Sequence, residues 1–133
     1  MITVDKFSRK PIYEQIVDEL EKQIVSGAIR ELEQLPSIRE LSMTLSINPN
    51  TIQKAFAELD LRGIIFSNQG RGCFVAEGAR DKIIAYRLSS LSQVTQLVKE
   101  LASLGIPKEA ILSAVEDAYE NIIGSDAGKE NKQ

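Results

Sequence analysis

Hydrophobic residues recur at three- and four-residue spacing near the start of the chain, which is the pattern of an amphipathic helix. Pro11 suits the first turn of such a helix and Gly27 suits the position just past its end, so a helix is predicted over residues 11–26. The polar connection that follows contains Leu32 and Leu35, and both side chains are expected to point into the core.

Two short helices separated by a tight turn are predicted next. Ser37 and Glu40 form the S-x-x-E pattern of a capping box at the start of the first of them. The second is predicted to begin at Asn48 and Pro49, because Asn is a strong N-cap and Pro loses no hydrogen bond in the first turn. Gly63 is expected to end it. Its predicted buried face consists of Ile52, Ala55, Phe56 and Leu59.

A β-hairpin is predicted after these helices. Residues 64–67 and 73–76 are rich in β-branched and aromatic side chains, and the turn between them contains Gly70 and Gly72. A helix, a turn and a second helix followed by a hairpin is the winged helix-turn-helix arrangement. We therefore predict a winged helix-turn-helix DNA-binding domain over residues 1–77.

The C-terminal part predicts a two-helix hairpin over residues 78–123. An apolar stripe from about Asp81 predicts one helix of about 24 residues that ends at Gly105, and a shorter helix follows it. Each helix would leave a flank of its stripe exposed, so a second copy of the chain is the simplest cover. The fold class is thus mostly α (α+β), with a C-terminal dimerisation hairpin and a disordered tail over residues 124–133.

The charge balance gives DNA binding no support. The chain has 133 residues and a net charge of −3, whereas a basic domain is the usual footprint of a nucleic-acid-binding protein. The acidic residues are unevenly spread, however. Between Pro36 and Ala76 the chain carries four basic and three acidic residues, which leaves room for a neutral or slightly basic face.

The composition excludes several other classes. The absence of histidine excludes Ser-His-Asp and Cys-His catalysis and zinc sites that need imidazole, and a single cysteine excludes an internal disulfide. Glu116, Asp117 and Glu120 are expected to be a solvated helix surface, and Cys73 a buried strand residue. No segment is apolar enough to span a bilayer, and no signal-peptide pattern is seen. We expect no enzyme activity, cofactor or metal, no membrane contact, and a cytoplasmic location.

The candidate chemistry lies on the predicted second helix of the motif and on the hairpin. Asn48, Asn50 and Gln53 are uncharged donors and acceptors of the kind that bind base edges and phosphates. Thr51 could reach a phosphate, and the helix N-terminus offers free N–H groups to it. Arg71, between two glycines at the hairpin tip, could lie along or in the minor groove.

Four motifs follow one another at defined spacing: PIYEQI at residues 11–16, LPSIREL at 35–41, NPNTI at 48–52 and GRGCFV at 70–75. Together they resemble the GntR family of bacterial transcription regulators, over about residues 8 to 77. The short C-terminal region resembles the YtrA subfamily, whose members are small dimeric repressors, often of operons that encode ABC transporters.

The resemblance implies that Arg39 grips DNA from the start of the short helix that follows Pro36. Gln53 stands where many members have Arg or Lys, which implies a weaker or adenine-directed contact there. Lys54 is expected to supply only general phosphate attraction or to be solvated. The complete set of expected DNA-binding residues is Arg39, Asn48, Pro49, Asn50, Thr51, Gln53, Lys54, Gly70, Arg71 and Gly72.

The resulting hypothesis is a homodimeric repressor that binds an inverted-repeat operator in double-stranded DNA; whether a small-molecule effector acts on it is left open by the sequence. Two alternatives remain open at this point. A winged helix can be a protein-interaction module, which the acidic balance suits. The C-terminal hairpin could instead make the chain a sensor that holds a small hydrophobic ligand.

Overall fold

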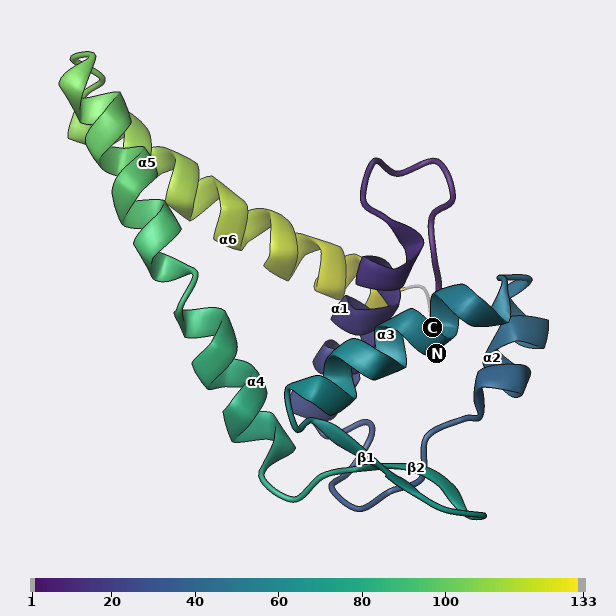
Figure 1. Cartoon of the computed structure of the whole chain (residues 1–133). Coiled ribbons are helices and arrows are strands. Elements are labelled where there is room, and N and C mark those ends of the chain that lie inside the picture. The colour runs from purple at the N-terminus through teal and green to yellow at the C-terminus, as the bar shows by residue number, and fades with distance from the viewer. Residues whose placement is uncertain (1, 132–133) are drawn as a thin grey trace. The chain divides into compact units, whose positions relative to one another are not determined.

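The computed structural model of the chain describes residues 2–131, with the side chains of residues 2–122. It is mostly helical, with one two-stranded antiparallel sheet (Figure 1). The chain forms two compact units, Met1–Leu88 and Ser89–Gln133. The elements are α1 (Ile12–Ser26), α2 (Ile38–Leu45), α3 (Pro49–Leu61), β1 (Ile65–Asn68), β2 (Gly72–Val75), α4 (Ala79–Leu88), α5 (Leu91–Ser103) and α6 (Lys108–Asn131).

The helix ends of the first unit confirm most of the capping predictions. Gly27 ends α1 in the left-handed conformation, with a φ of 86°. The Ser37 hydroxyl accepts the Glu40 N–H at 3.0 Å, and the Asn48 side chain caps α3 with Pro49 in its first turn. The prediction for Pro11 was wrong by one position, because this residue has an extended ψ of 145° and precedes α1.

The hairpin forms where it was expected, with each strand shifted by one residue. Ile65 lies opposite Val75, and Asn68 lies opposite Gly72. Just before β1, the Ile64 N–H is bonded to the Leu59 carbonyl at the end of α3, while the Ile64 carbonyl accepts the Ala76 N–H, both at 2.9 Å. The structure therefore has β1 one residue later than the predicted strand at 64–67, and β2 one residue earlier than the predicted strand at 73–76.

The connection between α1 and α2 covers the outer edge of β2. The Leu32 N–H donates to the Val75 carbonyl at 2.8 Å, and the Leu35 N–H donates to the Cys73 carbonyl at 2.9 Å. Leu35 is buried, as predicted. The prediction for Leu32 was wrong, because this backbone pairing holds it at a φ of 67°, and 61% of its side chain is exposed.

The core of the first unit lies between α1, α3 and the hairpin. All four predicted core residues of α3 are buried. The largest side chains that are completely enclosed are Ile16, Leu20, Ile52, Leu59, Ile64 and Val75. Cys73, which was expected to be buried, is only partly so, and its sulfur lies 3.5 Å from the Ser67 hydroxyl.

An ionic cluster joins α1 to α4 and to the end of α3. Glu21 of α1 is 4% exposed. Its carboxylate accepts the Arg87 Nε at 3.0 Å and lies 3.5 Å from the Arg62 Nη1. Arg87 also donates to Asp18 at 2.7 Å, and the Arg62 guanidinium lies 4.3 Å from the centre of the Tyr86 ring. Glu21 is therefore a buried carboxylate with two cationic partners.

The charges in this cluster shift the pKa values of their neighbours. Burial alone would raise the pKa of Asp18, but hydrogen bonds from Lys10 and Arg87 outweigh burial and lower the pKa below its ordinary value. The pKa of Arg87 is raised, chiefly by its hydrogen bond to Glu21. The acidic residues of this part of α1 are thus paired within the protein.

The prediction of one helix of about 24 residues from Asp81 to Gly105 was wrong, because the chain forms two helices there: α4 ends at Leu88 and α5 begins at Leu91. Ser89 and Ser90 stand at the break, where the Ser92 hydroxyl donates to the Ser89 carbonyl at 3.0 Å. Serines offer such local alternatives to the helical hydrogen-bond ladder. The units also divide here rather than after residue 77, because α4 packs on α1.

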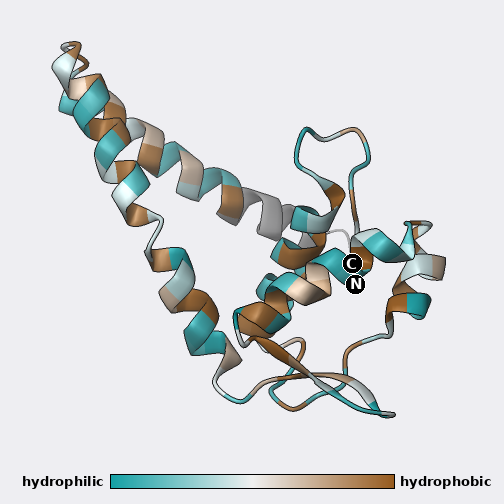
Figure 2. Cartoon of the chain, in the orientation of Figure 1, coloured by the Kyte–Doolittle hydropathy of each residue, from teal (hydrophilic) through white to brown (hydrophobic). Residues whose placement is uncertain are grey.

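The second unit contains α5 and α6. The α6 backbone continues past Gly124 to Asn131, whereas the sequence predicted a disordered tail from residue 124; residues 132–133 lie outside the described part. Apolar and polar residues alternate along both helices (Figure 2). No side chain described between residues 89 and 122 is buried. The described helices include none that is long and apolar enough to cross a membrane.

The ionic cluster predicts a large stability effect at one glutamate. Glu21→Ala is expected to lower the free energy of unfolding by about 3 kcal/mol, because Arg62 would remain buried without its carboxylate partner. Glu19→Ala is the matched control on the same helix: its carboxylate is 30% exposed and lies 3.6 Å from Lys22, so a loss below about 0.5 kcal/mol is expected. Urea denaturation measures both, and equal losses would contradict the assignment.

Candidate nucleic-acid interface

The face of α3 opposite the core carries polar side chains that point to solvent. Because α3 buries Ile52 and Leu59 completely, its 3.6-residue period turns Asn50 and Gln53 outward, where both are exposed. Gln53 borders a shallow groove between α3 and the hairpin, which Ser67 and other residues line from the β1 side. A ligand that lay along this face would meet both amides.

The N-terminus of α3 is built by Asn48. The Asn48 Oδ1 accepts the Asn50 N–H at 2.9 Å, and its carbonyl accepts the Thr51 N–H at 3.0 Å. The side-chain oxygen of Asn48 is therefore engaged in capping, while Pro49 in the first turn is exposed. Thr51 is half-buried, so of these residues Asn50 presents the most accessible side-chain hydrogen-bonding groups.

Arg39 stands in the first turn of α2 and is exposed. It borders an open cleft of about 820 Å³, which extends from α2 to the hairpin at Gly72. Within the described part of the chain, no hydrogen bond or ion pair engages the side chains of Arg39, Asn50 or Gln53. These groups are available to a ligand without breaking any contact of the folded protein.

The hairpin turn presents Arg71. Its side chain is exposed, and its N–H donates to the Asn68 carbonyl at 2.9 Å, closing the turn. Gly70 and Gly72 have φ values of 79° and 115°, which side-chain-bearing residues rarely adopt. Behind the turn, two phenylalanine rings stack across the strands with their centres 5.7 Å apart, and this contact stiffens the hairpin.

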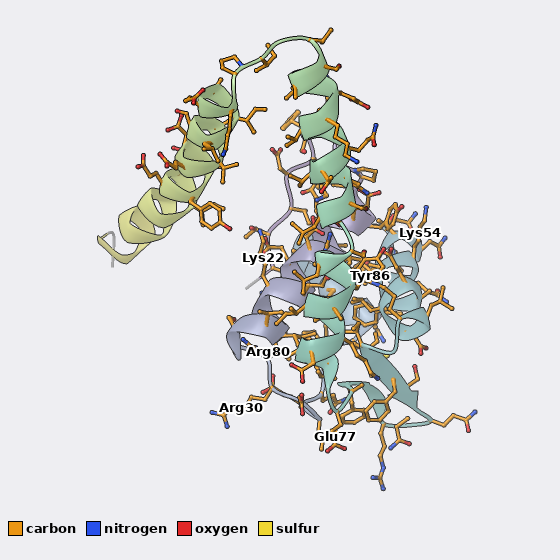
Figure 3. All side chains as sticks on the ribbon, turned by 90° about the vertical axis from the view of Figure 1, so that its left-hand side faces the viewer. Lys22, Arg30, Lys54, Glu77, Arg80 and Tyr86 are labelled. Atoms are coloured by element: carbon orange, nitrogen blue, oxygen red, sulfur yellow. The ribbon has the colours of Figure 1, made fainter. Side chains whose placement is uncertain are left out.

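Lys54 stands one turn after Asn50 on α3, and its side chain contacts α1. Its ammonium group is 4.0 Å from the centre of the Tyr13 ring of α1, a cation–π contact. Figure 3 labels Lys54 on α3, together with Tyr86 on α4. Phosphate attraction by Lys54 stays a prediction, and any such contact would compete with the Tyr13 ring.

Sequence reasoning missed two further residues beside this surface. The Lys6 Nζ donates to the Ser46 carbonyl at 3.3 Å, which brings a positive charge to the turn between α2 and α3. The Gln34 Nε2 donates to the Arg71 carbonyl at 2.6 Å. These contacts join residues 40 and 37 positions apart, and no local pattern in the sequence signals them.

The start of α2, the N-terminal end of α3 and the hairpin turn lie on the same side of the first unit (Figure 1). Arg39 and Gln53 each border a cleft that reaches the hairpin. The hairpin formed by β1 and β2 is called the wing below, and residues 69–71 are its tip. Two helices joined by a tight turn, with the second exposed along a polar face and a hairpin beside it, define a winged helix-turn-helix domain. The class of protein that uses this domain in this way is the DNA-binding transcription regulator.

Comparison with known proteins agrees with this class. Residues 12–75 match the family described as "Bacterial regulatory proteins, gntR family". The chain is 32% identical to the HTH-type transcriptional repressor YtrA of Bacillus subtilis, over 98% of this chain and 99% of the repressor.

Two solved structures are also similar. A GntR family transcriptional regulator from Listeria monocytogenes is 37% identical, with a TM-score of 0.66 over 86% of this chain and 98% of the other. YtrA from Sulfolobus acidocaldarius, a GntR-family transcription factor, is 35% identical, with a TM-score of 0.53 over 67% of this chain and 97% of the other.

The chain belongs to the GntR family of bacterial transcription regulators. The match to a YtrA repressor along almost the whole of both chains includes the short C-terminal region, which agrees with the resemblance seen in the sequence. The family name describes regulators of transcription and not a class of enzymes.

Substitution of the two asparagines at the start of α3 is expected to have different effects on the free energy of unfolding. Asn48→Ala is expected to lower the free energy of unfolding by about 1 kcal/mol, because α3 loses its N-cap. Asn50→Ala removes a side chain without an intramolecular partner, so its unfolding free energy should stay within about 0.5 kcal/mol of wild type. Chemical denaturation followed by circular dichroism measures both; a larger loss for Asn50→Ala would contradict the capping geometry.

Proposed function

We propose that the protein is a homodimeric repressor that binds an inverted-repeat operator, with one α3 helix in the major groove of each half-site. The observation that carries this proposal is the set of exposed polar side chains without intramolecular partners at the start of α2, along α3 and at the wing tip. Arginine and amide side chains of this kind are the groups that bind phosphates and base edges in protein–DNA complexes.

Each group has a role that its chemistry suits. Arg39 and the wing arginine, Arg71, would contact phosphates or the minor groove, and the free N–H groups at the start of α3 would add to phosphate binding. Asn50 and Gln53 would contact base edges, where an amide pairs best with adenine. Asn48, Thr51, Pro49 and Lys54 would border the DNA, with Asn48 also serving as the cap of α3.

The negative net charge does not oppose this proposal. Asp18 and Glu21 are paired with Arg87, Arg62 and Lys10 in the cluster on α1, so the field of these carboxylates is largely neutralised. Over residues 36–76, which contain α2, α3 and the hairpin, there are four basic and three acidic residues. One of the four, Arg62, belongs to the cluster, so the rest of this segment is close to neutral. Local charge at the contact surface governs phosphate binding more than the total does.

The second unit supports the dimer. Residues 89–122 contain no buried side chain, and large apolar groups there are strongly exposed, such as Leu104 at 79% and Tyr119 at 67%. A helical pair with no buried residue lacks the apolar burial that stabilises a fold. A second copy of the chain would cover the stripe on both helices, and the twofold symmetry of a dimer would match an inverted repeat.

DNA binding can be tested by fluorescence anisotropy on the region upstream of the protein's own gene, or of an operon for an ABC transporter, against a scrambled duplex. We expect preference for the operator and a falling log–log dependence on salt. Arg39→Ala should weaken binding to every sequence and reduce the salt slope by about 1. Gln53→Ala should remove about 1–3 kcal/mol of preference at one base pair.

Lys22→Ala is the matched control, because it removes one exposed positive charge from α1. Lys22 and Lys54 lie on opposite sides of the first unit (Figure 3). The salt slope of Lys22→Ala should equal that of wild type. If Arg39→Ala bound as tightly as wild type, its role would be disproved, and absence of any binding at low salt would favour a protein-interaction module.

The dimer has its own test. Leu97 of α5 is 55% exposed on the apolar stripe, so Leu97→Asp should convert the dimer to a monomer by placing a charge in the interface. Gln96→Asp, on the polar side of the same helix, should leave the dimer intact. Sedimentation velocity gives the mass of each, and a wild-type protein with the mass of a single chain would refute the homodimer.

A further inference from the structure

The wing is supported from outside by the segment between α1 and α2. Gln34 pairs with Phe74 in an antiparallel bridge. On either side of it, the Leu35 N–H donates to the Cys73 carbonyl at 2.9 Å, and the Val75 N–H donates to the Glu33 carbonyl at 3.0 Å. The base of the hairpin therefore has a third backbone segment along the edge of β2. These bonds end at residue 73 and do not reach the turn.

The side chain of Gln34 continues this support to the tip. Its Nε2 donates to the Arg71 carbonyl at 2.6 Å. In the described part of the chain, this is the one hydrogen bond that reaches residues 69–71 from outside the hairpin. The carbonyl belongs to the residue whose side chain is proposed to contact DNA, so the bond acts on the backbone that aims that side chain.

The position of the Gln34 side chain depends on the absence of a side chain at Gly72. A Cβ at Gly72 would lie 2.8 Å from the Gln34 Nε2, which is closer than two such atoms can approach. The turn alone would favour glycine at this position through its φ of 115°. A Cβ here would displace the end of the Gln34 side chain, so glycine at position 72 leaves the space in which the Gln34 amide reaches the Arg71 carbonyl.

A hairpin of two short strands is only marginally stable by itself and can swing about its base. A contact that holds the tip in one orientation lowers the entropy that DNA binding must otherwise remove. We propose that Gln34 is a positioning residue that orients the wing so that Arg71 meets the DNA. This inference rests on the proposed function, since it assigns Gln34 an effect on DNA affinity that is exerted through Arg71.

The first arm of the test uses the free protein. Gln34→Met keeps the length of the side chain and removes its donor. We expect the ¹H–¹⁵N heteronuclear NOE of the Gly70 and Gly72 amides to fall, and the Gly72 amide resonance to shift, because its peptide carbonyl loses the hydrogen bond. Gln96→Met makes the same substitution on the polar side of α5 and should change neither signal. Unchanged wing signals in Gln34→Met would overturn the inference.

The second arm measures operator affinity by anisotropy. Gln34→Met should weaken binding about threefold to fivefold, as loss of one surface hydrogen bond allows. In the Arg71→Ala background the same substitution should have no further effect, because the wing then has no arginine to aim. Additive losses in the double variant would show that Gln34 acts independently of Arg71 and would overturn the positioning role.

The two arms separate this inference from the proposed function. A wild-type protein that shows no operator preference would refute the proposed function and the effect of Gln34 on affinity together, whatever the wing signals show. A wild-type protein that binds, with Arg71→Ala weakened and Gln34→Met unchanged, would leave the proposed function intact and refute the positioning role alone. Only a mobile wing combined with non-additive losses supports it.

Discussion

The packing of α3 against α1 and the hairpin is the contact on which the rest of the first unit depends. Ile52 and Leu59 are completely buried, and burial of one such side chain is worth about 1.5–3 kcal/mol. Because α3 can rotate only by exposing these residues, its opposite face is determined as well. The outward position of Asn50 and Gln53 is thus a consequence of core packing, and the polar face of α3 needs no separate contact to hold it.

The ionic cluster on α1 is a second contact that joins the helices of the first unit. Glu21 and Asp18 lie on α1 with Arg87 from α4 and Arg62 from the end of α3. A buried ion pair adds little net stability because desolvation offsets the attraction. Its effect here is geometric, because it joins α1, α4 and the end of α3 at one point.

The parts of the fold that the sequence predicted are those determined by neighbours along the chain. The caps at Ser37 and Asn48 and the left-handed Gly27 depend on residues within a few positions, and the structure has all three. The failures have non-local or competing causes. Leu32 is turned outward by pairing with a strand more than 40 positions away, and the break at Ser89–Ser90 interrupts an apolar stripe that continues through it. The Gln34–Arg71 bond could not be predicted for the same reason.

Two elements of the molecule are incomplete by themselves, and this links stability to function. The wing obtains its missing edge from the segment around Gln34, within the chain. The helices of the second unit bury no described side chain, so the partner that covers them must come from outside the unit. If that partner is a second copy, binding of one half-site brings the second DNA-binding domain to a high local concentration at the other. Operator affinity would then depend on protein concentration through the dimerisation equilibrium, and a substitution on the apolar stripe of α5 would weaken DNA binding without touching any residue of the DNA surface.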